Sequence, residues 1–262
     1  MDRVAVVTGG SAGIGRKTAE ILAASGYRVY ELSRSGTSSP GICHLSADLC
    51  TEESIRSAFD ELRNREGKLD LLVNNAGCGI SGAAEFASVQ SVRRLFDVNF
   101  FGMLSCIQQA IPLLRANGGG RIINISSVAA VFSIPFQAFY SASKAAVNML
   151  TLSLRNELCP FQISVCAIMP GDVQSNFTAS REKKTDGSAL YGDAIQRAVS
   201  VMEKDEKNGM PPEIIARAVC QIAQKASTKP VYTVGVRYRL FVLLGKLLPC
   251  RIANWIVGKL YG

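Results

Sequence analysis

Tyr140 and Lys144 are the two side chains whose types and spacing best suit proton chemistry. They stand four residues apart near the start of a predicted helix, so they lie on one face, one turn apart. A phenol with a pKa of about 10 is a poor base at neutral pH, but a neighbouring ammonium group favours the phenolate. The pair could therefore take a proton from an alcohol or return one to a carbonyl oxygen.

A glycine-rich segment is suited to binding phosphate. Residues 8–15 read TGGSAGIG and lie between the first predicted strand and the first predicted helix. Glycines allow the tight turn there and let the backbone approach a pyrophosphate, whose charge then lies at the helix N-terminus. The segment therefore predicts a nucleotide-binding loop.

Two other motifs overlap this segment. Residues 9–13 match the G-x-S-x-G nucleophile elbow, but a hydrolase of that kind needs a histidine late in the chain, and the single histidine is His44. A P-loop needs Gly-Lys-Ser/Thr, whereas residues 15–18 read GRKT and carry one residue too many. Both alternatives are disfavoured. A single histidine also excludes a His-rich metal centre, and we expect no metal.

Three motifs together resemble the short-chain dehydrogenase/reductase family. They are the glycine loop, the segment Asn74-Asn75-Ala76-Gly77 after the fourth strand, and the segment Tyr140-Ser141-Ala142-Ser143-Lys144. The resemblance extends over about residues 3–178. It implies hydride transfer between a nicotinamide cofactor and the carbon of an alcohol or ketone.

The resemblance also implies a role for each catalytic side chain. Tyr140 exchanges the proton with the substrate, and Lys144 holds the hydroxyls of the nicotinamide ribose. Ser127, thirteen residues before Tyr140, hydrogen-bonds the substrate oxygen as negative charge develops, with Ser126 as the adjacent alternative. Asn99 anchors a water molecule beside the lysine.

The end of the second predicted strand indicates which nicotinamide cofactor binds. An acidic residue there would bond the ribose 2′-hydroxyl of NAD, whereas an arginine would accommodate the 2′-phosphate of NADP. By resemblance Ser33 occupies the acidic position and Arg34 follows it, while Glu31 lies earlier, inside the strand. Because a guanidinium forks onto a phosphate, the sequence predicts NADP(H).

The remaining cofactor contacts follow from the same resemblance. Asp48 contacts the adenine, residues 170–173 form the turn that covers the nicotinamide, and Ser175 keeps the hydroxyl of the family's usual threonine. The predicted cofactor-binding residues are Gly9, Ser11, Gly13, Ile14, Gly15, Ser33, Arg34, Asp48, Leu49, Asn75, Ala76, Gly77, Tyr140, Lys144, Pro170, Gly171, Val173 and Ser175.

Apolar residues near the catalytic positions predict a hydrophobic substrate. The predicted lining is Ser127, Val128, Phe132, Phe136, Tyr140 and Phe177. Residues 133–136 resemble hydroxysteroid and retinol dehydrogenases, so we expect a hydroxysteroid substrate. The alternatives are reduction of an acyl lipid or another hydrophobic ketone and, more remotely, a non-catalytic NADPH sensor. Sensors on this scaffold usually lose the tyrosine or the lysine, and this chain keeps both.

Alternating strands and helices predict the scaffold that positions these residues. The predicted fold is α/β, a doubly wound parallel sheet (Rossmann fold) in one domain, residues 1–236, with a polar substrate loop at about 172–211. The expected strands are 4–7, 28–32, 42–45, 69–73, 121–125, 163–168 and 231–234. The expected helices are 14–24, 52–64, 88–116, 139–158 and 212–225.

Composition agrees with one globular enzyme. The chain has 262 residues, of which 48% are apolar and 19% charged, so it can bury a large core and is not disordered, collagenous or a coiled coil. The net charge of +8 suits an anionic cofactor; lysines and arginines are dispersed, so we expect no nucleic acid. Eight cysteines without a CxxC pair or a signal-peptide pattern predict a cytoplasmic protein with reduced, buried thiols.

Residues 237–262 form a basic amphipathic extension. They contain five basic residues and no acidic one, with apolar residues between them, and predict two short helices divided at Pro249. Such helices pack on the chain's own body, cover the pocket, contact a partner subunit or lie on an anionic membrane. By family analogy we also expect a homodimer through residues 88–116 and 139–158, with the extension blocking a larger tetramer.

Overall fold

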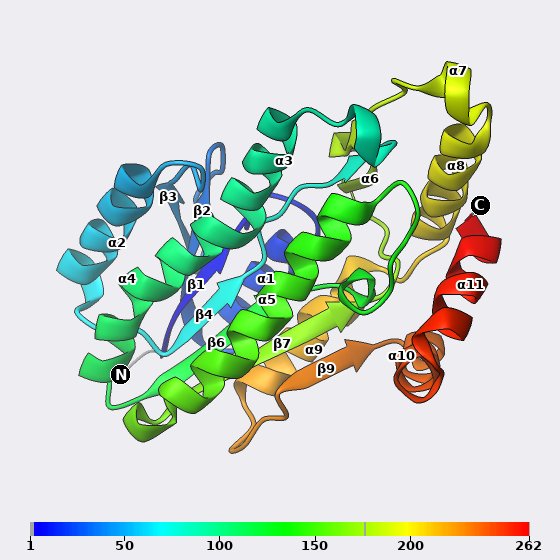
Figure 1. The fold of residues 1–262 in the computed structure, drawn as a ribbon. Helices are drawn as coiled ribbons and strands as arrows, with labels where there is room; N and C mark the ends of the chain where they lie inside the picture. Colours follow the sequence, from blue (N-terminus) through cyan, green and yellow to red (C-terminus); the bar gives the residue numbers. More distant parts are fainter. Residues whose placement is uncertain (1–2, 176, 262) are drawn as a thin grey trace.

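The computed structural model describes residues 3–175 and 177–261 and confirms the doubly wound parallel sheet. Seven parallel strands run in the order β3-β2-β1-β4-β6-β7-β9, with helices on both faces (Figure 1). The strands are β1 (Arg3–Thr8), β2 (Tyr27–Ser33), β3 (Ile42–Ser46), β4 (Leu71–Asn74), β6 (Gly120–Ile125), β7 (Ile163–Pro170) and β9 (Val231–Val234).

Helices cover the sheet and extend beyond its carboxyl edge. The α-helices are α1 (Gly13–Ala24), α2 (Glu52–Glu66), α3 (Val89–Phe96), α4 (Met103–Ala116), α5 (Ala138–Glu157), α6 (Phe177–Ser180), α7 (Ser188–Tyr191), α8 (Ala194–Lys207), α9 (Pro212–Ala223), α10 (Val236–Leu247) and α11 (Cys250–Tyr261). A small second sheet pairs β5 (Ile80–Ser81) with β8 (Glu182–Lys183). The short helices are η1 (Ala84–Phe86), η2 (Asp97–Gly102), η3 (Val128–Ala130) and η4 (Cys159–Phe161).

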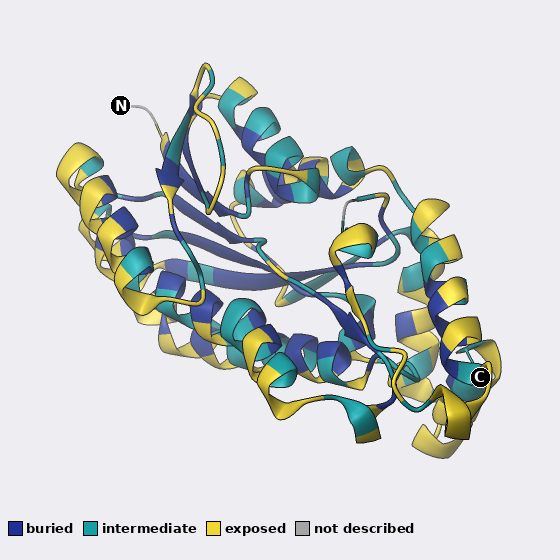
Figure 2. Cartoon of the chain, turned by 90° about the horizontal axis from the view of Figure 1, so that it is seen from above, coloured by how far each residue is buried: buried dark blue, intermediate teal, exposed yellow. Residues whose placement is uncertain are grey.

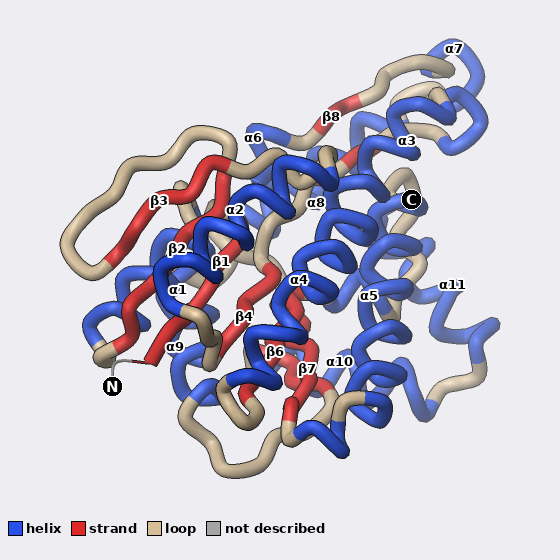
Figure 3. Tube along the Cα trace, turned by 90° about the vertical axis from the view of Figure 1, so that its left-hand side faces the viewer, coloured by secondary structure: helices blue, strands red, loops and turns tan. Residues whose placement is uncertain are grey.

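The apolar strands divide their side chains between two cores. In β1, Val4 and Val6 pack into the core beneath α2, α4 and α5, whereas Ala5 and Val7 pack into the core beneath α1 and α9. Figure 3 shows α4 and α5 side by side over one face of the sheet. Since successive side chains of a strand point to opposite faces, a strand covered on both sides must be apolar throughout, as the sequence pattern of β1 predicts.

The strand order reverses between β1 and β4. The chain after β1 builds β2 and β3 on one side, and the chain from β4 onward builds β6, β7 and β9 on the other. Loops that leave the carboxyl ends of β1 and β4 therefore diverge and leave a crevice between them, which is where ligands bind in folds of this kind.

Residues 177–210, part of the polar loop expected at about 172–211, are largely helical. They form α6, α7 and the fourteen-residue helix α8, whose buried residues Ile195, Ala198, Val199 and Met202 follow helical spacing. The apolar pattern of α8 was present in the sequence, but the surrounding Lys, Asp and Glu residues obscured it. The predicted helix 88–116 is interrupted by η2, a π-helical segment between α3 and α4.

The structure revises one further expectation, on the cysteines, and contains the two helices expected near the C-terminus. All eight cysteines are free thiols, but Cys50, Cys159 and Cys250 are exposed rather than buried. Residues 236–261 form the two predicted helices, and Figure 2 shows much of their surface exposed at one end of the molecule. Within residues 3–175 and 177–261, no helix is long and apolar enough to cross a bilayer.

A buried polar ladder joins β4 and β6 to α5. Asn74 Nδ2 donates to Asn124 Oδ1 at 2.9 Å, and Asn124 Nδ2 donates to Thr151 Oγ1 at 2.9 Å. Thr151 donates in turn to the carbonyl oxygen of Val147 at 2.7 Å. The ladder ties the end of β4 to the helix that carries Tyr140 and Lys144.

We predict that Asn124→Ala lowers the free energy of unfolding by about 2–4 kcal/mol, because it leaves the Asn74 amide and one lone pair of Thr151 buried without a partner. Urea unfolding followed by circular dichroism measures this change. Asn64→Ala, an exposed position on α2, is the matched control. A loss no larger than that of the control would show that the ladder does not stabilise the sheet.

Candidate active site

A cavity of about 860 Å³ opens at the carboxyl edge of the sheet. Its walls come from the glycine loop, the segments after β2, β4, β6 and β7, and the helices α5, α10 and α11. Most of the predicted site residues line it: Gly9, Ser11, Gly13, Ile14, Ser33, Arg34, Asp48, Leu49, Asn75, Ala76, Gly77, Ser127, Val128, Phe132, Tyr140, Lys144, Pro170, Gly171, Val173, Ser175 and Phe177.

Three predicted site residues do not line the cavity. Gly15 lies beneath the loop, where an added Cβ would come within 2.1 Å of the Gly9 carbonyl oxygen. Phe136 has a φ of 59° and turns its ring edge-on to Tyr191, with ring centroids 5.9 Å apart, in a separate small core. Gly15 thus lets the glycine loop pack closely against the start of α1, and Phe136 packs against Tyr191 outside the cavity.

Asn99 is the third of these residues and lies behind the wall. It is 2% exposed, its Oδ1 accepts from Cys78 N at 2.8 Å, and its Nδ2 donates to Cys78 O at 2.9 Å and to Ser143 Oγ at 3.1 Å. A Cβ placed on Gly77 would lie 3.2 Å from Asn99 Oδ1 and 3.5 Å from Lys144 Nζ. Asn99 therefore anchors the turn after β4 close to the lysine.

The glycine loop has the shape that an anionic group requires. Gly9 and Gly13 have φ values of 65° and 54°, which favour glycine. Ala12 precedes α1 without a side-chain cap, and the first turn of α1 carries no acidic residue, so its backbone N–H groups are left for a ligand. This part of the site fits the pyrophosphate of a dinucleotide.

At the end of β2, an arginine rather than a carboxylate lines the cavity. Glu31 is fully buried, contacts His44 Nδ1 and accepts from Ser33 Oγ at 3.3 Å. Gly36 packs over it so closely that a Cβ there would lie 1.7 Å from Glu31 Oε1. The carboxylate is therefore held away from the cavity, while the exposed Arg34 lines it.

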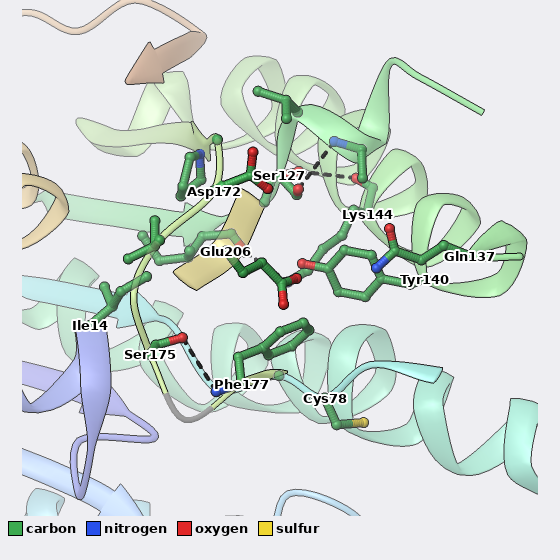
Figure 4. A pocket seen from close by; sticks show the side chains of 18 of the residues that line it. Ile14, Cys78, Ser127, Gln137, Tyr140, Lys144, Asp172, Ser175, Phe177 and Glu206 are labelled. Carbon is green, nitrogen blue, oxygen red and sulfur yellow. Dashed lines mark hydrogen bonds between the residues drawn. The ribbon is translucent and has the colours of Figure 1, made fainter. Parts of the chain in front are cut away.

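The two adjacent serines after β6 have different partners. Ser126 Oγ is buried and donates to the carbonyl oxygen of Lys144 at 3.2 Å. Ser127 accepts from Ala129 N at 3.1 Å, and its hydroxyl lowers the pKa of Tyr140. The geometry therefore favours Ser127 over Ser126 as the hydroxyl that faces a reacting oxygen; Figure 4 shows Ser127, Tyr140 and Lys144 at one cavity wall.

Burial controls the ionisation of Tyr140 and Lys144. Desolvation raises the pKa of Tyr140 to about 12, against smaller lowering by the Ser127 hydrogen bond and the Arg181 charge. Desolvation also lowers the pKa of Lys144 to about 8, and its Nζ donates to Ile125 O at 3.0 Å.

The expected lowering of the Tyr140 pKa by Lys144 is therefore not found in the protein itself. Lys144 Nζ lies 5.7 Å from the centroid of the Tyr140 ring and points to a backbone carbonyl. Tyr140 remains a protonated phenol at neutral pH, which is the form that donates a proton to a carbonyl oxygen.

Several residues of the site were missed from the sequence. Gln137, 5% exposed, and Glu206 of α8 both line the cavity near Tyr140 (Figure 4). Glu206 pairs with the buried Arg181 and accepts from Thr178 Oγ1. The position of Gln137, three residues before Tyr140, was a usable signal; Glu206 had none, because only the fold of α8 brings it to the cavity.

The inner faces of α10 and α11 form the far wall. Leu244, Ile256 and Leu260 line the cavity there, and Gly245 packs against Phe132. Tyr238 Oη donates to Asp172 Oδ2 at 2.6 Å and ties α10 to the turn after β7. The C-terminal helices thus contribute a mostly apolar wall, which also contains Arg237, Tyr238 and Tyr261.

Comparison with known proteins is consistent with this geometry. Residues 3–186 match the family model for short chain dehydrogenases. The chain is 36% identical over 247 residues to the 3-ketodihydrosphingosine reductase of Bacteroides thetaiotaomicron, covering 93% of this chain and 91% of that protein. It is 35% identical over 248 residues to the rhamnolipids biosynthesis 3-oxoacyl-[acyl-carrier-protein] reductase of Pseudomonas aeruginosa, covering 89% and 92%.

A solved structure shares the whole architecture. The crystal structure of a short-chain dehydrogenase from Streptomyces avermitilis superposes with a TM-score of 0.85 at 26% identity, over 98% of this chain and 96% of that one. The similarity therefore extends through the C-terminal helices.

We predict that Lys144→Met raises the free energy of unfolding at pH 7 by about 1–3 kcal/mol, because it removes a buried ammonium group. The lowered pKa of Lys144 means that the folded state binds its proton less tightly than the unfolded state. Wild-type stability therefore gains a contribution as the pH rises from about 8 towards the ordinary lysine value.

Urea unfolding between pH 7 and 10 of the wild type, of Lys144→Met and of the exposed-site control Lys229→Met measures this contribution. The difference between wild type and Lys144→Met should shrink with rising pH, and the control should follow the wild type. A difference independent of pH would contradict the lowered pKa.

Proposed function

Since the chain belongs to the short-chain dehydrogenase/reductase family, we propose that it reduces the ketone of a long-chain lipid to a secondary alcohol with NADPH. The observation that carries the proposal is the cavity itself. One continuous space joins the Tyr140 hydroxyl to the apolar inner faces of α10 and α11. A substrate with a ketone at one end and a hydrocarbon chain fits that arrangement.

The residues of this chain divide the reaction between them. When NADPH is bound, it supplies the hydride. Tyr140, protonated at neutral pH, donates the proton to the carbonyl oxygen, and the Ser127 hydroxyl hydrogen-bonds that oxygen as negative charge develops. The hydride and the proton together convert the C=O group to CH–OH. Lys144 holds its charge below a pH of about 8 and would hold the hydroxyls of the nicotinamide ribose.

The proposed preference for NADPH rests on two residues at the end of β2, Arg34 and Glu31. Arg34 lies exposed at the cavity and provides a guanidinium for the 2′-phosphate, while Glu31 is buried against His44 and offers no carboxylate to a ribose hydroxyl. The dispersed positive charge of the chain adds a favourable field for a dinucleotide carrying that extra phosphate.

The relatives support a lipid ketone over a steroid. Two of the most similar proteins are named as reductases of 3-ketodihydrosphingosine and of a 3-oxoacyl carrier-protein substrate. Both names describe a keto group near the polar end of a chain. In this cavity Gln137 and Glu206 provide polar contacts near Tyr140, and the apolar wall lies beyond them.

A hydroxysteroid remains the second candidate substrate. Val128 and Phe132 line the cavity close to Ser127, as the sequence predicts for a rigid apolar substrate. The third hypothesis, a non-catalytic sensor, is disfavoured because Ser127, Tyr140 and Lys144 are all present and line the same cavity. The proposed homodimer uses the outer faces of η2 and α5, where Phe101 and Met149 are 55% and 66% exposed.

The test of the function is NADPH oxidation against a panel of ketones. We expect saturable turnover of long-chain 3-keto lipids, namely 3-ketodihydrosphingosine and 3-oxoacyl thioesters, and weaker turnover of ketosteroids.

Tyr140→Phe should lower kcat by about a thousandfold, since it removes the proton donor, yet retain NADPH binding. Tyr191→Phe, which alters an exposed tyrosine outside this cavity, is the matched control. Turnover of ketosteroids alone would overturn the lipid assignment, and an active Tyr140→Phe would overturn the mechanism.

The cofactor preference has its own test. We predict that Arg34→Glu reduces the ratio of kcat/KM for NADPH over NADH at least tenfold, because the new carboxylate repels the 2′-phosphate. Steady-state kinetics with both cofactors measure the ratio. Arg56→Glu on α2, an equally large charge change at an exposed site, should leave it unchanged. An unchanged ratio in Arg34→Glu would assign the preference to other residues.

A further inference from the structure

The outer face of α10 and α11 is the most apolar exposed surface of the described chain. Of the nineteen large apolar side chains that are exposed, ten lie between residues 236 and 260. The inner faces of the same helices line the cavity, so these ten include residues that face outward with nothing of this chain packed on them.

The outward residues follow helical spacing. Leu240, Leu243 and Leu247 recur at intervals of three and four along α10 and are 54%, 54% and 72% exposed. Ile252 and Trp255, 45% and 63% exposed, share a face of α11. None of the five lines the cavity. Each helix therefore has an inner apolar face that packs on the body and an outer apolar face that is free.

The charge of this surface has one sign. Arg237, Arg239, Lys246, Arg251 and Lys259 are all exposed, Arg237 also lining the cavity, and the segment from 236 to 261 contains no acidic residue. Within the described part of the chain, none of these five forms an ion pair. Basic side chains interleaved with exposed leucine, isoleucine and tryptophan suit a surface that is both negatively charged and apolar beneath.

We propose that the outer face of α10 and α11 docks onto an anionic lipid bilayer. Each helix has twelve residues, too few to cross the hydrocarbon core. They therefore lie in the interface, with leucine, isoleucine and tryptophan side chains among the acyl chains and lysine and arginine side chains at the lipid phosphates. An apolar interface with a soluble protein would not require unpaired basic residues along the whole of this surface.

Docking in this way brings the cavity to the membrane. The helices that would touch lipid with their outer faces form the apolar wall of the cavity with their inner faces. An apolar ligand leaving the bilayer would enter the cavity beside these helices. The docking surface is inferred only from the exposed apolar side chains and the basic residues of α10 and α11. It therefore does not depend on which ketone the enzyme reduces.

The chain contains a built-in reporter for the test. Its one tryptophan is Trp255, on the proposed docking face. The full-length protein is mixed with vesicles of phosphatidylcholine alone, or of equal parts phosphatidylcholine and phosphatidylglycerol. We expect co-sedimentation and a blue shift of tryptophan emission with the anionic vesicles only, both weakening as salt is raised.

Charge reversal separates this surface from the general positive charge of the protein. The variant Lys246→Glu with Lys259→Glu should bind anionic vesicles at least tenfold more weakly than wild type. The matched control, Arg56→Glu with Arg63→Glu on exposed α2 positions, should bind within twofold of wild type. Leu247→Glu, which puts a charge into the apolar face, should also weaken binding and abolish the blue shift.

Three outcomes would overturn the proposal. The first is no binding of the wild-type protein to anionic vesicles. The second is an equal loss of binding in the α2 control, which would mean general electrostatic attraction. The third is a wild-type protein that does not co-sediment with vesicles and a Leu247→Glu variant whose sedimentation coefficient without lipid differs from that of wild type. That result would show that this face contacts a second copy of the chain.

Discussion

The contact between the glycine loop and the turn after β4 is the constraint on which the site depends. Asn75 Nδ2 donates to the carbonyl oxygens of Thr8 at 3.0 Å and Gly9 at 3.3 Å, and Thr8 Oγ1 accepts from the backbone of Asn75 and Ala76. These bonds join the two loops at the point where the strand order reverses. Only glycine fits at position 15 beneath them, because any side chain would collide with the Gly9 carbonyl.

From that contact the rest of the site is assembled by packing. Asn74, the residue before Asn75, continues into the buried ladder through Asn124 to Thr151 on α5. The same helix carries Tyr140 and Lys144 one turn apart. The loop that would hold a dinucleotide and the helix that would move a proton are thus linked through one hydrogen-bonded path across β4 and β6.

Burial gives this site its electrostatic character. It raises the pKa of Tyr140 and lowers that of Lys144, so at neutral pH the phenol is neutral and the amine still carries its proton. Glu31 is buried as well, so its carboxylate does not line the cavity where the ribose of a dinucleotide would bind. Apolar helices close the far end of the cavity with one face and expose a basic apolar surface with the other.

The sequence by itself determined the fold class, the alternation of strands and helices, and the residues of the glycine loop and of the Tyr140 helix that line the cavity, because apolar periodicity and short motifs are local properties of the chain. It placed Tyr140 and Lys144 on one helix face and separated Arg34 from Glu31. Tertiary structure alone decided that burial outweighs the lysine in setting the pKa of Tyr140. It also decided that the Ser126 hydroxyl is held by the Lys144 carbonyl, that Phe136 turns outward, and that α8 brings Glu206 inward. These outcomes depend on desolvation and on contacts between residues far apart in the chain, which no local pattern encodes.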